Sequence, residues 1–228
     1  MPAVAAAEVQ SQGGTRINLN ATMETQLPND EVVISFRVEK EGQNARMVRQ
    51  YVNKVSASIQ KRLQQEQAVK LTTTGRNMQP VWKHVPKKPR VRTGWRMVQT
   101  GQVVSKSLDA VPIWLDTIEA AGAHLSGLQF RLSAETSKQA QDKLRLQAIE
   151  LFREKASTIT KGLSAKSFKI IRLSTSKHLP QPVMYRSEMA MMAKSADMGA
   201  PSLSSGEGKV SVTVTGEIET PFVDFSNQ

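Results

Sequence analysis

Cysteine is absent from the 228 residues of this chain. Its absence excludes disulfide frameworks, thiolate nucleophiles and zinc sites built on cysteine. The sequence also lacks an apolar run of about 18 residues, which excludes a membrane-spanning helix. A chain of this length can still bury a core that is stable without disulfides or metals. We therefore expect one large domain or two small ones.

Acidic residues are in short supply. The chain has 20 Asp and Glu against 31 Lys and Arg, so its formal net charge is +11. Such a charge attracts anions over long distances but carries no information about the fold. The candidate partners are nucleic acid, lipid headgroups, acidic polysaccharide and acidic protein.

Sequence patterns of known catalytic sites are missing as well. His84, His124 and His178 are far apart, and none has the second His or the carboxylate that metal-binding helices place one turn away. There is no Walker A loop and no Gly-x-Ser-x-Gly elbow. We predict that the protein is not an enzyme and binds no cofactor or metal. A hydrolase whose site escapes inspection of a single sequence is kept as an alternative.

Alternation of apolar and polar residues predicts two strands near the start of the chain, from Ile17 to Met23 and from Val32 to Val38. The segment Leu27–Asp30, with the sequence LPND, separates them and has the composition of a turn. We expect the two strands to pair as an antiparallel hairpin.

A period of 3.6 predicts long amphipathic helices at about 44–65 and 137–161. Asp109 is placed to cap a short helix that ends at Gly122. The remaining expected strands are 69–78, 91–104, 128–132, 168–173 and 210–218. We predict an α+β fold with an antiparallel-rich sheet and the two long helices packed on one face.

A weak internal repeat accompanies this layout. Phe36-Arg37-Val38 matches Phe130-Arg131-Leu132, and both segments lead into long helices. The helices end in similar sequences, SASIQKRL and ASTITKGL, at a different offset. Duplication of a β-α unit and coincidence between two amphipathic units both explain the match.

The densest positive charge lies between Trp82 and Arg96, in WKHVPKKPRVRTGWR, which contains no acidic residue. Aromatic stacking and phosphate contacts could bind an anionic polymer here, either nucleic acid or acidic glycan. The alternative is a basic hairpin tip whose Trp95 points into the core, since Val91, Thr93, Trp95 and Met97 share one face of a regular strand. The candidate binding residues are Trp82, Lys83, Lys87, Lys88, Arg90, Arg92 and Arg96.

A stretch rich in Met and Pro, residues 176–208, shows no sustained period. Thioethers are soft ligands that suit Cu(I), and flexible Met side chains also fill irregular contacts with a partner. A third interpretation is an exposed loop whose methionines oxidise reversibly under stress. The methionines concerned are Met184, Met189, Met191, Met192 and Met198.

The N-terminal segment MPAVAAAEVQ ends its alanine run in the small-x-small pattern of a signal-peptide cleavage site. It lacks the charged region and the apolar region that precede such a site. It is therefore either the remnant of a trimmed or mis-started signal peptide or a plain disordered terminus. We assign residues 1–15 to this segment, 16–220 to the folded domain and 221–228 to a tail.

The order of the elements resembles the SIMPL-domain family, named for a signalling protein associated with a pelle-like kinase. The resemblance runs from about Arg16 to Ile218. It rests on INLNATMETQLPNDEVVISFRVEKEG, on the step Gly94-Trp95-Arg96, on LDAVPIWLDTIEAAGAHLSGLQFRLS, on LRLQAIELFREKASTITKGL and on the final strand VSVTVTG. Asn29 separates Pro28 from Asp30, which are adjacent in most of the family.

The resemblance implies a secreted protein of the bacterial periplasm or envelope, linked to oxidative-stress tolerance. Some family members assemble into large rings, and no catalytic residue set is established for them. It follows that we expect a homo-oligomer or binding to an envelope partner. The alternative, which rests on the basic segment 82–96, is a protein that binds an anionic polymer. The resemblance also favours the signal-peptide interpretation of MPAVAAAEVQ, with upstream residues missing.

Overall fold

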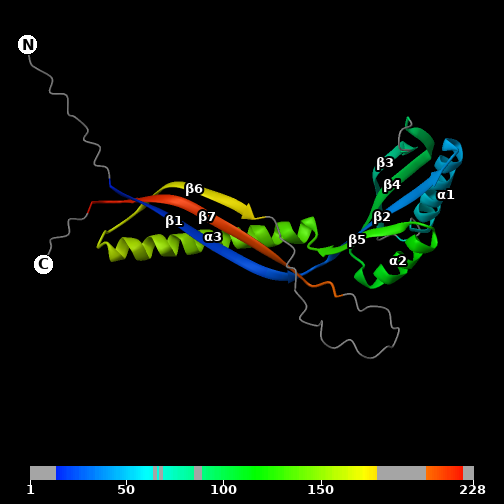
Figure 1. The fold of residues 1–228 in the computed structure, drawn as a ribbon. Helices are drawn as coiled ribbons and strands as arrows, with labels where there is room; N and C mark the ends of the chain where they lie inside the picture. Colours follow the sequence, from blue (N-terminus) through cyan, green and yellow to red (C-terminus); the bar gives the residue numbers. More distant parts are fainter. Residues whose placement is uncertain (1–13, 64–65, 67–68, 85–88, 179–203, 223–228) are drawn as a thin grey trace, which may run out of the picture. The chain divides into compact units, whose positions relative to one another are not determined.

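The computed structural model describes residues 14–63, 66, 69–84, 89–178 and 204–222, arranged in two compact units (Figure 1). Of the described residues, unit 1 combines those within 14–26, 137–178 and 209–222, and unit 2 combines those within 27–136 and 204–208. Unit 2 thus interrupts the sequence of unit 1. Each unit contains its own antiparallel sheet and its own buried apolar cluster.

The sheet of unit 1 has the strand order β1-β7-β6, formed by β1 (Thr15–Pro28), β7 (Glu207–Thr220) and β6 (Lys169–His178). The long helix α3 (Ala134–Gly162) packs on this sheet. Alternation decides which face it covers, because every second residue of β7 from Val210 to Ile218 is buried while its neighbours are more accessible.

The core of unit 1 is small and lies between α3 and two of the three strands. Its buried residues come from β1, β7 and α3. None of them comes from β6, the edge strand of this sheet. The buried residues of this cluster are Ala21, Ala148, Phe152, Ala156, Val214 and Ile218.

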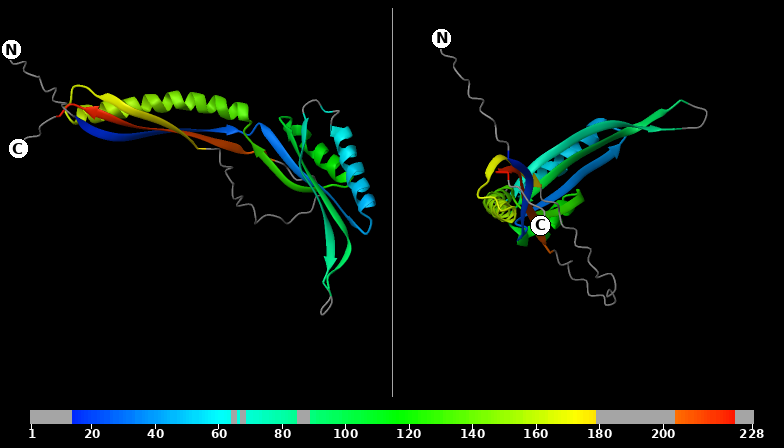
Figure 2. Two further views of the ribbon diagram at one scale, coloured as in Figure 1. Left: turned by 90° about the horizontal axis from the view of Figure 1, so that it is seen from above. Right: turned by 90° about the vertical axis from the view of Figure 1, so that its left-hand side faces the viewer.

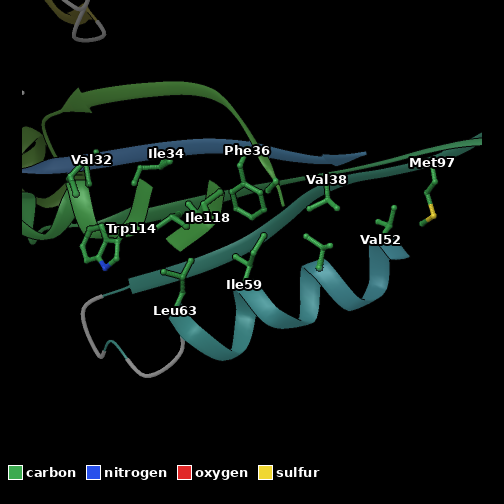
Figure 3. Packing of buried hydrophobic residues seen from close by; sticks show 14 of the residues in the cluster. Val32, Ile34, Phe36, Val38, Val52, Ile59, Leu63, Met97, Trp114 and Ile118 are labelled. Atoms are coloured by element: carbon green, nitrogen blue, oxygen red, sulfur yellow. The ribbon is translucent and has the colours of Figure 1, made fainter. Parts of the chain in front are cut away.

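The sheet of unit 2 has the order β3-β4-β2-β5. Its strands are β2 (Glu31–Gly42), β3 (Val69–Lys83), β4 (Val91–Ser105) and β5 (His124–Arg131), and its helices are α1 (Ala45–Leu63), the 3-10 turn η1 (Leu108–Ala110) and α2 (Val111–Ala120). In Figure 3, α1 presents Val52, Ile59 and Leu63 to the inward side chains of β2. Each fully buried side chain of this size contributes roughly 1.5–3 kcal/mol of apolar burial.

The connection from β2 to α1 is tight, and two residue types make it so. The Asn44 side chain accepts hydrogen bonds from the backbone N–H groups of Arg46 and Met47, which caps the helix. A Cβ built on Gly94 of β4 would lie 2.8 Å from the carbonyl oxygen of Gly42. Glycine at position 94 therefore allows the backbone of β4 to approach the backbone at Gly42, the last residue of β2.

The α+β class is confirmed, but the arrangement of the sheet differs from the expectation in three ways. The strands around Ile17 and Val32 do not pair, because β1 hydrogen-bonds in one sheet and β2 in the other. The two long helices do not share one face of one sheet, since α1 packs on unit 2 and α3 on unit 1. Asp109 lies inside η1, and α2 begins after Ala110 without a side-chain cap.

The two β-α segments of the sequence repeat, β2 with α1 and β5 with α3, pack differently. The helix α1 packs back on the sheet that contains β2. The helix α3 follows β5 in the chain but packs on β1 and β7, which belong to the other sheet. The sequence match therefore joins segments whose local structure is alike and whose tertiary contacts differ.

Candidate functional site

The basic hairpin of the sequence is formed by the paired ends of β3 and β4, which run on past α1 in both views of Figure 2. We call residues Trp82–Lys83 and Pro89–Arg92 the tip. The last pairs of the register are Trp82 with Arg92 and Lys83 with Val91. Pro80 is tolerated inside β3 because this strand is the edge of its sheet.

A β-bulge near the tip changes which side chains share a face. The register passes from Val81–Gly94 to Trp82–Arg92, so Thr93 is the extra residue. Paired residues of an antiparallel ladder lie on the same face. Trp82 and Arg92 therefore lie on one face of the tip, and Lys83 and Val91 lie on the other.

Trp95 is half-buried and not a core residue. The guanidinium carbon of Arg92 lies 5.1 Å from the centre of its ring, a cation-π distance. The expectation of one continuous face from Val91 to Met97 is wrong, because the bulge at Thr93 moves Val91 to the opposite face. Met97 lies on the side of the bulge away from the tip and is buried, as expected.

Arg96 is removed from the set of free cations by an ion pair. Its Nε lies 2.7 Å from Oε1 of Glu39, on the face of the sheet opposite Met97. The hydrogen bond from Arg96 lowers the pKa of Glu39, and Glu39 in turn raises the pKa of Arg96. The Gly94-Trp95-Arg96 step therefore acts within unit 2, through a close backbone approach, a stacked ring and an ion pair.

The cations of the tip that remain are Lys83, Arg90 and Arg92, all exposed. Within the described residues none of them has a carboxylate at ion-pair distance. Lys87 and Lys88 lie outside the described residues. So do the methionines at positions 184, 189, 191, 192 and 198, whose oxidation or metal binding stays a prediction.

A second candidate surface is the strand β6, which the sequence did not single out. Ile170, Ile171 and Leu173 are 43%, 46% and 39% exposed. Ile170 pairs with Ile218 and Leu173 with Gly216, so both lie on the face of the sheet where α3 packs, yet neither joins its core. Ile171 is the extra residue of a bulge.

The two edges of the unit 1 sheet differ. On β1, the Lys155 ammonium of α3 donates a hydrogen bond of 3.0 Å to the backbone carbonyl oxygen of Asn20. On β6, the hydrogen bonds found in the described part of the chain all run to its neighbour β7. A lysine over an edge strand is one way that proteins block further pairing. Within the described residues, a side chain of α3 bonds to the backbone of β1 and none bonds to that of β6.

A polar cluster at the start of α3 was also missed from the sequence. The Asp30 carboxylate accepts hydrogen bonds from the backbone N–H of Ser133 (2.6 Å), from its hydroxyl (2.7 Å) and from the Thr136 hydroxyl (2.6 Å). Burial raises the pKa of Asp30, but these hydrogen bonds outweigh burial and the net pKa lies below its ordinary value. The signal available in the sequence was Ser133 three residues before Thr136, the spacing of a helix N-cap.

Neither a metal cluster nor a membrane-spanning helix is present in the described ranges. No three His, Asp or Glu side chains there gather in a group that could hold a metal ion. His84 and His124 are exposed. None of the described helices is long and apolar enough to cross a membrane.

Comparison with protein-family models gives a match over most of the chain. A family model, SIMPL, described as "Protein of unknown function (DUF541)", matches residues 17–218. The matched range begins in β1 and ends in β7. No curated protein matches the chain.

Proposed function

The chain belongs to the SIMPL family, and on this premise we propose that it is a non-enzymatic periplasmic protein that assembles with copies of itself and supports tolerance of oxidative stress. The location and the stress role are those that the family resemblance implies. The assembly has support of its own in the fold. One observation carries it, the open apolar edge of β6.

The edge of β6 has two features that a second copy would satisfy. Its outer backbone groups can accept a further strand, since pairing within the described residues is limited to β7. Ile170 and Leu173 lie outside the buried core and remain 43% and 39% exposed. A strand or helix of a second copy that lies along β6 would remove these side chains from water, at about 25 cal/mol per Å² of apolar surface.

Among the described residues, the two carboxylates with shifted pKa values are both engaged within the fold and neither is suited to act as a general acid. A general acid at neutral pH needs a carboxyl group whose pKa is raised. The pKa values of both Asp30 and Glu39 are lowered by hydrogen bonds to their own neighbours. Both groups are thus held ionised and are engaged in supporting the fold.

Substitution of the β6 edge tests the assembly. We expect the wild-type protein to sediment as a multi-subunit species and the double variant Ile170→Lys/Leu173→Lys to sediment as a monomer, because two charges in place of the apolar side chains would have to be buried in the contact. The matched control is Ile113→Lys/Leu146→Lys, which adds the same charge at two exposed apolar side chains of α2 and α3. Circular dichroism would verify that both variants fold.

Two results would count against the proposal in different ways. A wild-type protein that is monomeric at every concentration removes assembly altogether. A β6 variant that assembles like its control leaves assembly standing and removes the edge as its cause. For the stress role, cells that lack the protein should lose survival in peroxide and regain it with the wild-type chain but not with the β6 variant.

A further inference from the structure

The tip of the β3–β4 hairpin carries exposed apolar and cationic side chains that take no part in the core of unit 2 or in the proposed assembly. Trp82 is 53% exposed and Val91 is 56% exposed, at the end of a hairpin that runs past α1 (Figure 2). Large apolar side chains at a projecting end lie outside the core cluster of unit 2. Both side chains are therefore accessible to a partner with an apolar region.

The charge around these side chains restricts the partner. Lys83, Arg90 and Arg92 surround them, and the sequence from Trp82 to Arg96 has no acidic residue. Each of the two faces carries one apolar side chain and one cation, Trp82 with Arg92 and Val91 with Lys83. The partner must therefore be anionic and must present an apolar layer to both sides of the tip.

Single-stranded nucleic acid fits this geometry poorly. Proteins that bind it arrange several open aromatic rings along one charged groove. In the described part of the hairpin Trp82 has an open ring, whereas Trp95 already stacks with Arg92. A chain laid along one face would also leave Val91 on the other face in water.

An anionic lipid surface fits better, because an inserted tip is surrounded on all sides. Trp prefers the boundary between headgroups and acyl chains, and the stems of Lys and Arg extend toward the headgroups. Cations close to an anionic leaflet add attraction for each residue. We infer that the tip, through Trp82, Val91, Lys83, Arg90 and Arg92, docks the protein on the surface of an anionic lipid bilayer.

Vesicle binding tests the inference with the full chain. We expect sedimentation with vesicles of phosphatidylcholine and phosphatidylglycerol, weaker binding to phosphatidylcholine alone, and loss of binding as salt rises. Lys83→Gln/Arg90→Gln should weaken binding about 25-fold, or about fivefold for each cation. Trp82→Ala should weaken it about tenfold, the effect of withholding roughly 60 Å² of apolar surface.

Two cations of α1 supply the matched control. Lys61 and Arg62 are exposed, and Lys61→Gln/Arg62→Gln lowers the net charge by the same amount. They lie close in the chain to Val69, at the opposite end of β3 from Lys83, and a strand of 15 residues spans roughly 50 Å. We expect this variant to bind within about twofold of the wild type, because charges farther than a Debye length from the bilayer are screened. Equal losses in the tip variant and in this control would overturn the inference, since net charge alone would then explain binding.

Fluorescence quenching adds a readout that does not depend on affinity. Lipids brominated on their acyl chains should quench part of the Trp emission of the wild-type protein, and Trp82→Phe should abolish that quenching while binding persists. Quenching that survives in Trp82→Phe would place a different Trp in the bilayer and overturn the inference. So would binding of single-stranded DNA through the tip residues with no binding to vesicles.

Discussion

At the start of α3, one carboxylate organises three hydrogen-bond donors. Asp30 follows β1 by two residues and receives bonds from Ser133 and Thr136, more than a hundred positions later in the chain. Ser133 in turn accepts a hydrogen bond from the Thr136 backbone N–H, as a helix N-cap does. Asp30 therefore joins the turn before β2 to the first turn of a helix.

Replacement of Asp30 should be costly at neutral pH and nearly neutral in acid. We expect Asp30→Asn to lower the free energy of unfolding by about 1–3 kcal/mol at pH 7, because all three donors lose a charged acceptor and the amide offers one oxygen in place of two. The folded pKa of Asp30 is lowered, so its contribution is present above its unfolded pKa and is lost as pH falls through the folded value. The difference between variant and wild type should therefore shrink toward pH 3 in urea titrations.

Glu135 is the control for that experiment. It lies one residue from the helix start and forms an exposed ion pair with Lys106. Glu135→Gln should leave the unfolding midpoint close to that of the wild type at both pH values, since exposed pairs contribute little. If the deficit of Asp30→Asn were equally large in acid, the lowered pKa would not be its cause.

At the scale of elements, Gly94 shows how a short motif positions a strand. Gly94→Ala should lower the free energy of unfolding by about 1–3 kcal/mol, because the added Cβ would meet the Gly42 carbonyl oxygen at 2.8 Å. A Cβ built on Gly162 at the end of α3 meets nothing within 4 Å. Gly162→Ala is therefore expected to be neutral or slightly stabilising, and equal losses in both variants by urea unfolding would contradict the steric argument.

Helices and strands follow from periodicity, but their partners do not. The pattern Val48, Val52, Val55, Ile59 predicts α1, and these residues are buried as the pattern requires. Alternation at Ile17 and at Val32 likewise predicts two strands, yet a period of two does not state which strand lies alongside. The short segment Leu27–Asp30 suggested that the two neighbouring strands form a hairpin. The true partner of β1 is β7, and nothing in the alternation of β7 distinguishes it from the other strands as that partner.

The candidate sites were predictable in part for a similar reason. The basic run shows in the composition, whereas the bulge at Thr93 and the pairing of Arg96 with Glu39 depend on contacts between distant segments. The apolar edge of β6 was hidden because Ile170, Ile171 and Leu173 look like ordinary core residues until the position of α3 is known. Exposure is a tertiary property, and a single sequence does not contain it directly.

At the scale of the whole molecule, the two units have separate cores. Phe152 belongs to the core of unit 1 and Ile59 to the core of unit 2. Phe152→Ala removes about 3–5 kcal/mol of packing and Ile59→Ala about 2–5 kcal/mol. We expect native-state hydrogen exchange to show faster exchange mainly in β7 and α3 for the first variant, and mainly in β2 and β4 for the second.

Each variant serves as the control of the other. Uniformly faster exchange across both sheets in either variant would show that the units unfold as one cooperative body. A loss confined to the unit that carries the substitution is the expected result. The same experiment would measure how far the free energies of unfolding of the two units are independent.

The pairing of β1 with β7 also determines when the sheet of unit 1 can form during synthesis. Thr22 and Thr213 touch across these strands although 191 positions separate them. At about 5–20 residues per second, a ribosome takes roughly 10–40 s to deliver the second strand after the first. Throughout that interval Ile17, Leu19 and Met23 have no β7 to pack beside, so the sheet of unit 1 is completed only after most of the chain has been synthesised.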